Sequence, residues 1–293
     1  MVSNAPTIAG IELGGTKCIV LLGTGPADVR AQQTIPTTDP ATTLAAIEAV
    51  LDGWSFDAIG VASFGPLQLD TGAPDYGAIT ATTKPGWSGT DLVRRLERRY
   101  GKPIGFQTDV NGAVLAEGRW GAAQGLATHA YITVGTGVGV GLVAGGRPVQ
   151  GVAHGEAGHM RVRRAPGDSF AGWCRFHGDC VEGLVSGPAL AARFGRPGHE
   201  LPVDGPEWDL FVHDLSGLLH NLVTVAAPER IAIGGGVIAA RSHLFPRLRA
   251  RLAESLGGYG SLASYAEELD DRLGPPGLGN MAGPLGALAV GLG

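Results

Sequence analysis

A group of metal-binding residue types lies between positions 159 and 180. Cys174, His177 and Cys180 are spaced three residues apart in a loop that is rich in glycine, and His159 precedes them. Thiolate and imidazole are ligands that Zn²⁺ prefers, and four protein ligands are typical of a structural site. His154 is an alternative upstream ligand that the spacing does not exclude. The pattern therefore predicts a zinc site, with a disulfide or a chance cluster as the alternatives.

Two carboxylates, Glu156 and Glu182, flank these ligands in the sequence. A metal that pins the loop would also fix these side chains, because residues next to metal ligands are oriented by them. Carboxylates held in this way could accept hydrogen bonds from sugar hydroxyl groups.

Asp109 follows a run that predicts a strand (103–108) and comes just before one that predicts a helix (111–120). A carboxylate at such a strand end should lie at the rim of a cleft. There it could accept the proton of an attacking hydroxyl group during phosphoryl transfer. An N-cap aspartate is the alternative, and the position alone favours the cap.

Three glycine-rich turns could bring backbone N–H groups close to phosphates. The first, Gly14-Gly15-Thr16-Lys17, adds a hydroxyl group and a positive charge, but it lacks the spacing of a P-loop and could be an ordinary hairpin turn. The second, Gly135-Thr136-Gly137-Val138-Gly139, is similar, and the two could close on one polyphosphate. The third, Gly234-Gly235-Gly236, could admit a base or ribose, or only allow a helix to pack closely on a strand.

The elements that must position these residues follow one order twice. Hydrophobic periodicity predicts strands at 8–13, 17–22, 58–64, 103–108, 131–134, 138–143 and 230–233, and helices at 38–51, 91–100, 111–120, 208–226 and 284–292. This order predicts two similar α/β lobes with a cleft between them. We expect a small lobe at 1–109, joined by the C-terminal helix (284–293), and a larger lobe at 110–283 that contains the zinc loop.

Charge and composition argue against a nucleic-acid-binding, secreted or membrane protein. The 293 residues carry a formal net charge of −5, so we expect no nucleic-acid partner. The N-terminus lacks the pattern of a signal peptide, and the longest uncharged stretch (130–146) is broken by glycines, so we expect neither secretion nor a membrane. Three cysteines without a secretion signal favour a reducing compartment, and we expect a cytoplasmic protein.

Taken in this order, the motifs resemble those of the ROK family (repressors, open reading frames, kinases), within the superfamily of sugar kinases, actin and Hsp70-like ATPases. The similarity covers essentially the whole chain. It rests on Ile11-Glu12-Leu13-Gly14-Gly15-Thr16-Lys17, Thr108-Asp109-Val110-Asn111-Gly112-Ala113, Gly135 to Gly139, His154-Gly155-Glu156-Ala157-Gly158-His159, Cys174 to Glu182, and Gly234 to Val237. The resemblance implies an α/β, two-lobed, actin-like ATPase (ribonuclease H-like) sugar-kinase fold and an ATP-dependent hexose kinase that forms a homodimer.

The resemblance also implies roles for individual residues. Asp109 becomes the catalytic base instead of a cap. The sugar would be bound by Gly65, Pro66, Asn111, Glu156, His159 and Glu182, with Lys84-Pro85-Gly86-Trp87 close by. The phosphates of ATP would be bound by Gly14, Gly15, Thr16, Lys17, Thr136 and Gly137, and the adenosine would lie beside Gly235 and Gly236. Structural Zn²⁺ would be bound by His159, Cys174, His177 and Cys180, with the second ring nitrogen of His159 facing the sugar, and Glu12 stands where the family usually has an aspartate near Mg²⁺.

Two departures from the family pattern favour fructose as the substrate. ROK glucokinases usually carry Asn where this chain has Thr108, and their metal loop reads Cys-x-Cys-Gly-x-x-Gly-Cys. Both differences resemble the zinc-containing bacterial fructokinase branch. Because the first strand begins near Ile8, we expect no DNA-binding helix-turn-helix of the kind found in the family's repressors. We therefore expect conversion of fructose to fructose 6-phosphate; glucose, mannose or an N-acetylhexosamine is the alternative substrate, and a catalytically silent sugar sensor is the alternative class.

Overall fold

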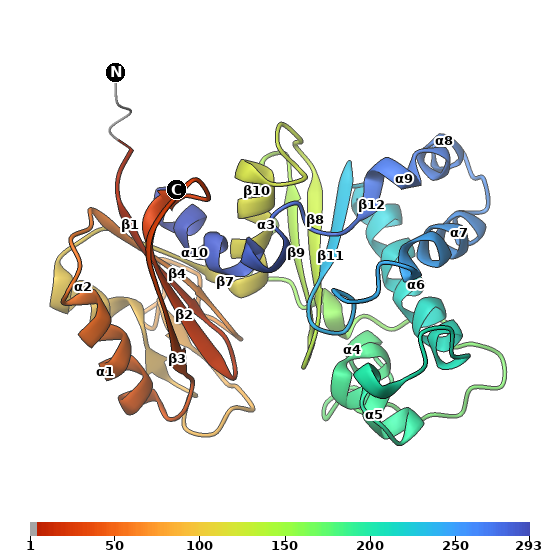
Figure 1. Ribbon diagram of the computed structural model, residues 1–293, viewed down its shortest axis with the longest axis horizontal. Coiled ribbons are helices and arrows are strands. Elements are labelled where there is room, and N and C mark those ends of the chain that lie inside the picture. The colour runs from red at the N-terminus through yellow and green to blue at the C-terminus, as the bar shows by residue number, and fades with distance from the viewer. Residues whose placement is uncertain (1–4) are drawn as a thin grey trace. The chain divides into compact units, whose positions relative to one another are not determined.

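The computed structural model describes residues 5–293, which form two units (Figure 1). The first contains the residues up to Gly125, with Pro148–Gly155 and Met281–Gly293, and the second contains Leu126–Arg147 and Glu156–Asn280. The chain thus enters the second unit after Gly125, whereas the sequence placed the boundary near Asp109. Helix α3 (Asp109–Trp120) packs on the C-terminal helix α10 (Ala282–Leu292), and this contact keeps both helices in the first unit.

The first unit is built on a five-stranded sheet with the order β3-β2-β1-β4-β7. Its strands are β1 (Ile8–Leu13), β2 (Lys17–Gly25), β3 (Asp28–Pro36), β4 (Ala58–Ser63) and β7 (Ile104–Thr108). Strand β2 is antiparallel to both of its neighbours, whereas β1, β4 and β7 run parallel. The unit also contains α1 (Pro40–Leu51), α2 (Val93–Tyr100) and the short pair β5 (Ala78–Ile79) and β6 (Thr90–Asp91).

The two faces of this sheet carry different residues because successive side chains of a strand point to opposite sides. Ala9, Ile11 and Leu13 of β1 belong to a hydrophobic core that also contains residues of α1 and α2. Gly10 and Glu12 point the other way, toward α10. One face is thus an apolar core, while the other carries a carboxylate next to a helix.

Helix α10 lies against this second face along a row of three glycines. Gly10, Gly60 and Gly105 are direct neighbours on β1, β4 and β7. A Cβ atom at Gly60 would overlap the carbonyl oxygen of Ala287, and a Cβ atom at Gly105 would overlap that of Val290. Because any side chain here would push the helix away, the glycine row sets the distance between helix and sheet. Part of the high glycine content therefore serves internal packing.

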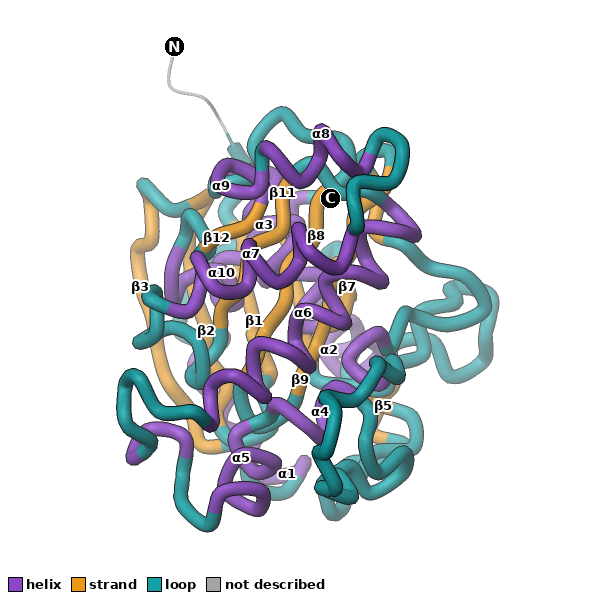
Figure 2. The backbone as a smooth tube through the Cα atoms, turned by 90° about the vertical axis from the view of Figure 1, so that its right-hand side faces the viewer, coloured by secondary structure: helices purple, strands orange, loops and turns teal. Residues whose placement is uncertain are grey.

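The second unit repeats this plan with the sheet order β10-β9-β8-β11-β12. Its strands are β8 (His129–Val134), β9 (Val138–Ala144), β10 (Arg147–Pro148), β11 (Arg230–Gly234) and β12 (Leu273–Gly274). Its helices are α4 (Val181–Val185), α5 (Gly187–Phe194), α6 (Glu207–Ala226), α7 (Leu244–Leu256), α8 (Leu262–Glu267) and α9 (Leu269–Arg272). Helices α6 and α7 lie side by side over the sheet (Figure 2), and their apolar residues share one core with β8, β9 and β11.

The repeat extends to single hydrogen bonds. In each unit an antiparallel hairpin (β1–β2, β8–β9) is followed by a strand that pairs in parallel with the first strand of the hairpin (β4, β11). The N–H of Phe64, just after β4, donates to the Leu13 carbonyl, and the N–H of Val237, after β11, donates to the Val134 carbonyl. The two lobes predicted from the order of elements are therefore alike in topology.

The predicted strands and helices are all present in the described residues, with ends that shift by a few positions. The sequence did not indicate β3, because its side chains are mostly exposed and show no apolar alternation. Two arginines of α2 pair with carboxylates, Arg95 with Glu48 and Arg99 with Asp52. None of the helices in residues 5–293 combines the length and the apolar character needed to cross a membrane.

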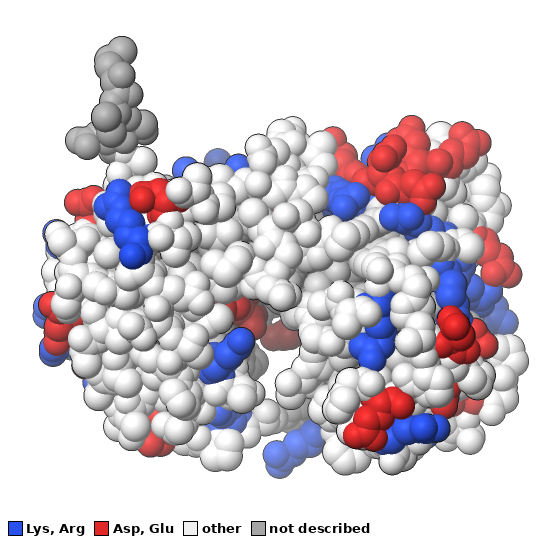
Figure 3. All heavy atoms as spheres, in the orientation of Figure 1, with Lys and Arg blue, Asp and Glu red and all other residues white. Residues whose placement is uncertain are grey.

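Charged side chains of both signs are interspersed on the face of the molecule drawn in Figure 3. The largest acidic group on this face lies over α8 and α9. Its exposed members are Glu267, Glu268, Asp270 and Asp271. Arginines neutralise part of this charge, since Arg249 pairs with Asp270 and Arg272 with Glu268.

The glycine row can be tested by adding a single methyl group. Gly60→Ala should lower the free energy of unfolding by about 2–3 kcal/mol, because the new Cβ has no space under α10 and the helix or strand must move. Urea unfolding would measure this. Gly53→Ala is the matched control, since the nearest atom to a Cβ there is the Val50 carbonyl oxygen at 3.6 Å. Equal stabilities of the two variants would contradict the proposed packing constraint.

Candidate active site and metal centre

Asp109 does not cap helix α3. The N-cap is Thr108, whose Oγ1 accepts a hydrogen bond from the N–H of Asn111 at 3.1 Å. Asp109 is the first residue of the helix, and its Oδ1 accepts from the N–H of Val110 at 2.8 Å. The position of Asp109 in the sequence favoured a role as the N-cap residue, and this prediction is wrong because Thr108 caps the helix. Asp109 lies, half-buried, at the carboxyl end of the parallel strand β7.

A second carboxylate, Glu12 of β1, lies near Asp109 in the first unit. Burial raises the pKa of Glu12 to about 7, the negative charge of Asp109 acts in the same direction, and Lys17 opposes both. Its Oε1 occupies the space that a Cβ at Gly283 would need, in the first turn of α10. Gly283 therefore makes room for the longer carboxylate that this chain has in place of the aspartate usual in the resembling family.

The turn Gly14–Lys17 links β1 to β2 and is held from outside. The N–H of Gly14 donates to the Lys17 carbonyl at 3.1 Å, and Thr37 Oγ1 donates to the Gly14 carbonyl at 2.8 Å. Lys84 Nζ donates to the carbonyl of Gly15 at 2.6 Å. With these carbonyl groups bonded, the exposed Gly15, Thr16 and Lys17 make up the outer surface of the turn.

Other residues of the first unit that were expected at or near the sugar form hydrogen bonds within the protein or adjoin residues that do. The N–H of Leu67, next to Pro66, donates to His154 Nε2 at 3.0 Å, so this ring nitrogen is already engaged. Asn111 is buried, and its Nδ2 donates to Gln107 Oε1 at 2.9 Å. Trp87, which was expected near the sugar, is fully buried, and its indole N–H donates to the Thr38 carbonyl. Trp87 is therefore part of the core.

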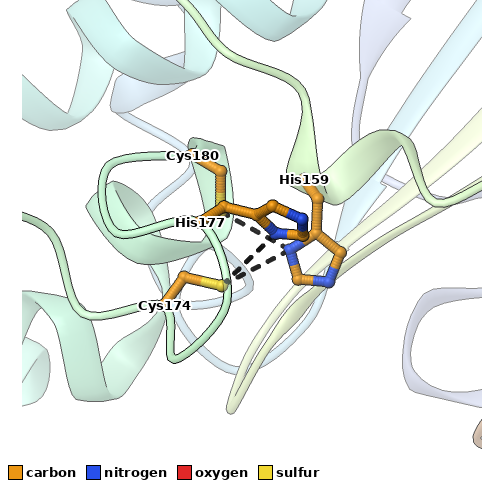
Figure 4. Close-up of side chains that lie close together, drawn as sticks. All are labelled: His159, Cys174, His177 and Cys180. Carbon is orange, nitrogen blue, oxygen red and sulfur yellow. Dashed lines mark hydrogen bonds between the residues drawn. The ribbon is translucent and has the colours of Figure 1, made fainter.

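Four side chains of the second unit converge on one point (Figure 4). The ligand atoms of His159, Cys174, His177 and Cys180 all lie within 4.8 Å of one another. His159 Nδ1 is 3.4 Å from Cys180 Sγ and 3.6 Å from Cys174 Sγ, and Cys174 Sγ is 3.7 Å from His177 Nδ1. Both histidines therefore turn Nδ1 toward the thiols. The open question of His154 is answered as well, because that residue lies in the first unit and binds Leu67.

These distances fit a tetrahedral zinc site. Zn–S bonds of about 2.3 Å and Zn–N bonds of about 2.0–2.1 Å place sulfur and nitrogen ligands about 3.5 Å apart. The three separations between sulfur and nitrogen are close to that value. Burial and the neighbouring Cys174 raise the pKa of the Cys180 thiol to about 11, so this thiol would ionise at neutral pH only beside a cation. The donor set and its geometry thus suit Zn²⁺.

The loop that carries these ligands is folded back on itself. The N–H of Cys174 donates to the Gly178 carbonyl, and the N–H of Gly178 donates to the Cys174 carbonyl, at 3.1 and 2.9 Å. Gly178 has a φ of +60°, which suits a residue without a Cβ. Cys180 then becomes the N-cap residue of α4. The spacing of the three ligands thus has a structural cause. A tight turn spans Cys174 to Gly178, and a helix begins directly after Cys180.

Helix α4 links this metal centre to the second glycine turn. Glu182 Oε2 accepts a hydrogen bond from the N–H of Val138 at 3.1 Å and would be 2.7 Å from a Cβ at Gly137. Gly158 packs against the carbonyl group of Val138, the residue whose N–H binds Glu182. The turn, Glu182 and the 3₁₀ turn Ala157–His159 thus meet at Val138.

The third glycine cluster, at the carboxyl end of β11, combines two functions. Gly235 has a φ of +91°, and a Cβ there would crowd the backbone of Val134, so this glycine is needed for packing. Gly236 has no atom within 4 Å of the position of its Cβ. Gly235 is therefore explained by close packing, although against strand β8 and not against a helix as the sequence suggested, and an open surface is present at Gly236.

The chain matches the family model described as ROK family over residues 8–292. This chain belongs to the ROK family. It is 39% identical over 97% of its length to a fructokinase of Pediococcus pentosaceus, of which 96% is covered. It is also 39% identical over 96% of its length to a fructokinase of Zymomonas mobilis, of which 95% is covered. A solved ROK hexokinase from Thermus thermophilus matches with a TM-score of 0.78 at 28% identity, with 97% of each chain covered.

Family membership confirms the resemblance drawn from the motifs and the actin-like fold that it implied. The structure places the sequence-predicted site residues in two groups, one in each unit. The first unit holds Gly14, Gly15, Thr16, Lys17, Gly65, Pro66, Asp109 and Asn111. The second holds Thr136, Gly137, Glu156, His159, Cys174, His177, Cys180, Glu182, Gly235 and Gly236. Sequence reasoning missed Gly283 as the partner of Glu12, and the only signal was a glutamate inside an otherwise apolar strand.

The raised pKa of Glu12 makes a prediction for stability. A carboxyl with a folded pKa of about 7 and an unfolded value near 4.5 binds more protons in the folded state between these values. Its contribution to stability is complete below pH 4.5 and is lost as the pH rises through 7. The free energy of unfolding of Glu12→Gln minus that of the wild type should therefore rise by about 2–3 kcal/mol between pH 5 and pH 8.

Urea unfolding at the two pH values, without added Mg²⁺, measures this difference. Glu12→Asp keeps a carboxyl group at the position and should retain part of the wild-type pH dependence. Parallel pH profiles for the wild type and Glu12→Gln would show that Glu12 is ionised normally in the folded protein.

Proposed function

We propose that this chain is an ATP-dependent fructokinase that converts fructose to fructose 6-phosphate. The observation that carries the proposal is the position of Asp109 at the carboxyl end of β7. Thr108, and not Asp109, is the N-cap residue of α3. The carboxyl ends of parallel strands are where α/β folds bind their ligands. The choice of fructose rests on the two curated relatives, which are both fructokinases and align with nearly the whole chain.

In this proposal Asp109 accepts the proton of the fructose hydroxyl group while the hydroxyl oxygen bonds to the γ-phosphorus of ATP. The bond between the γ-phosphorus and the bridging oxygen breaks, and ADP leaves. Phosphoryl transfer needs little else from the protein than positioning and neutralisation of charge. Asn111, two residues further along the same helix, and the segment Gly65-Pro66 hold the sugar. Mg²⁺, when bound with ATP, supplies positive charge on the phosphates, and Glu12 is the carboxylate we assign to its surroundings.

The two hairpin turns bind the phosphates through backbone N–H groups. Gly14, Gly15, Thr16 and Lys17 do so in the first unit, and Thr136 and Gly137 in the second. Two features support this assignment. The carbonyl groups of the first turn are engaged with Thr37 and Lys84, and the exposed Thr16 and Lys17 add a hydroxyl donor and a positive charge. Gly235 and Gly236 flank the adenosine.

We further propose that the metal centre holds structural Zn²⁺ and presents sugar-binding groups. With His159 bound through Nδ1, its Nε2 is left on the other side of the ring and can contact the sugar. Glu182 follows Cys180 by two residues on α4, so fixing the metal ligand also fixes Glu182. Glu156, just before the 3₁₀ turn, completes the set. A homodimer and a cytoplasmic location stay predictions from the family and from the free cysteines.

A sugar panel tests the proposed activity. With ATP and Mg²⁺, coupled release of ADP should be fastest with fructose, and the product should be fructose 6-phosphate by enzymatic or NMR identification. The other sugars of the panel are glucose, mannose and N-acetylglucosamine. Faster turnover of one of these would keep the kinase and reject the choice of fructose. No ADP with any sugar, from protein with its zinc in place, would favour the sugar-sensing alternative.

The role of Asp109 has its own test. Asp109→Asn keeps the size of the side chain but removes the proton acceptor, so kcat for fructose should fall by about 10²–10⁴. Fructose binding, measured by calorimetry, should change little, and an unchanged melting temperature would show that the fold is intact. Turnover near that of the wild type would remove Asp109 from the mechanism.

The metal centre is tested by removing one ligand. Cys174→Ser should lower the zinc content well below one ion per chain and weaken fructose binding, because the loop that places Glu182 and His159 loses its anchor. Metal analysis and calorimetry measure the two effects. Cys18→Ala is the matched control, since Cys18 is a buried thiol of the first unit and its loss should leave zinc in place. A Cys174→Ser protein that keeps its zinc and its activity would contradict the assignment.

A further inference from the structure

Three charged side chains lie inside the second unit, away from the residues assigned above. The side chains of Arg193, Asp168 and Asp214 are only 3%, 6% and 0% exposed. Arg193 comes from α5 and Asp214 from α6, whereas Asp168 belongs to the irregular segment that leads into the metal loop. Burying charge is unfavourable even in pairs, and apolar residues of similar size would often serve stability as well. These residues therefore call for a role besides stability.

Arg193 joins three separate elements. Its Nη1 donates to Asp214 at 2.8 Å and its Nη2 donates to Asp168 at 2.5 Å. The same Nη1 reaches the carbonyl group of Leu184 in α4, at 3.4 Å. The guanidinium also lies over the rings of Phe170 and Phe194, at 5.5 and 5.6 Å from their centroids. Arg193 thereby holds the segment around Asp168 against α4 and α6.

A second arginine continues the chain of ion pairs to the metal centre. Arg164 Nε donates to Asp168 at 3.2 Å, and Arg164 Nη1 donates to Asp179 at 3.1 Å. Arg164 also donates to the carbonyl group of Phe170 at 2.7 Å. Asp179 is the residue immediately before the metal ligand Cys180. A continuous set of charged hydrogen bonds thus runs from α6, deep in the core, to the metal loop.

We propose that this ionic network (Asp214, Arg193, Asp168, Arg164 and Asp179) positions the metal loop, so that the four ligands are assembled before the metal binds. The inference rests on the proposed zinc site and deepens it. Apolar packing does little to hold the loop, because Trp173 and Phe176 are 59% and 69% exposed. A site assembled in advance binds metal more tightly because less chain has to be ordered on binding.

The test compares two arginines that bind the same aspartate. Arg161 also donates to Asp179, at 2.9 Å, but its side chain is 70% exposed, whereas that of Arg164 is 22% exposed and is also bonded to Asp168. Arg164→Met should weaken zinc binding at least tenfold, in line with the effect of removing residues that support metal ligands. Arg161→Met should weaken it less than threefold. Zinc dissociation constants come from competition with a chromophoric chelator, starting from the zinc-loaded proteins.

A merely stabilising role would lower the melting temperature of Arg164→Met and leave its zinc affinity unchanged, and that result would overturn the proposal. So would equal losses of affinity in the two arginine variants. If Arg164→Met fails to fold, Asp179→Ala removes the acceptor of both arginines at a side chain that is 35% exposed, and it should weaken zinc binding at least tenfold, well beyond the effect of Arg161→Met. A wild-type chain that turns over fructose but binds no zinc would reject the metal site, and the network proposal with it, while leaving the kinase assignment intact.

Discussion

The close approach of helix α10 to the first sheet determines the arrangement of the first unit. Gly10, Gly60 and Gly105 leave the sheet surface bare where the helix crosses it. Once α10 is in place, Gly286 lets α3 pack against it at Gly112, with their backbones in direct contact. That packing fixes the start of α3, and with it Asp109. The position of the proposed base therefore follows from backbone contacts that only glycine permits.

The second unit uses the same topology but holds its candidate site residues by other means. Around Val138, a carboxylate from α4 accepts a hydrogen bond from the N–H of this residue, and a glycine of the 3₁₀ turn packs against its carbonyl group. Helix α4 is only one turn long, so it has little stability of its own. Its beginning depends on Cys180, and its Leu184 carbonyl is reached by Arg193. The glycine turn, the metal centre and the buried charges are therefore parts of one connected structure.

Much of this was accessible from the sequence because the relevant signals are local. Apolar alternation predicted the hairpins, and the spacing of Cys174, His177 and Cys180 predicted a convergent site, since a tight turn brings such residues together. The order of motifs predicted the family. Glycine, however, has several uses: the sequence alone cannot say whether Gly235 faces a ligand or a strand, because only the position of Val134 decides it.

The features that the sequence did not reveal depend on contacts between distant residues. Thr108 and Asp109 are both good N-cap residues, and the choice between them is made by where β7 ends. Gly283 matters only because β1 brings Glu12 to α10. Asp214 does leave a local sign, as a charge on the buried face of α6 between Phe211 and Leu215. Such a residue indicates a buried partner, but the partner, Arg193, cannot be identified without the fold.

The contrast between the two units has a physical cause in their loops. In the first unit the functional residues lie directly at strand and helix ends, and an apolar core beneath them supplies rigidity. In the second, residues 161–180 contain no helix or strand, and the aromatic residues of the metal loop are exposed. Val162 and Phe170 pack against the core of the second unit, but the metal loop itself buries little apolar surface to offset the conformational entropy lost when it is ordered. Directional interactions must then order the loop in place of apolar packing. Its charged residues can form ion pairs, and its cysteines and histidines can bind a metal.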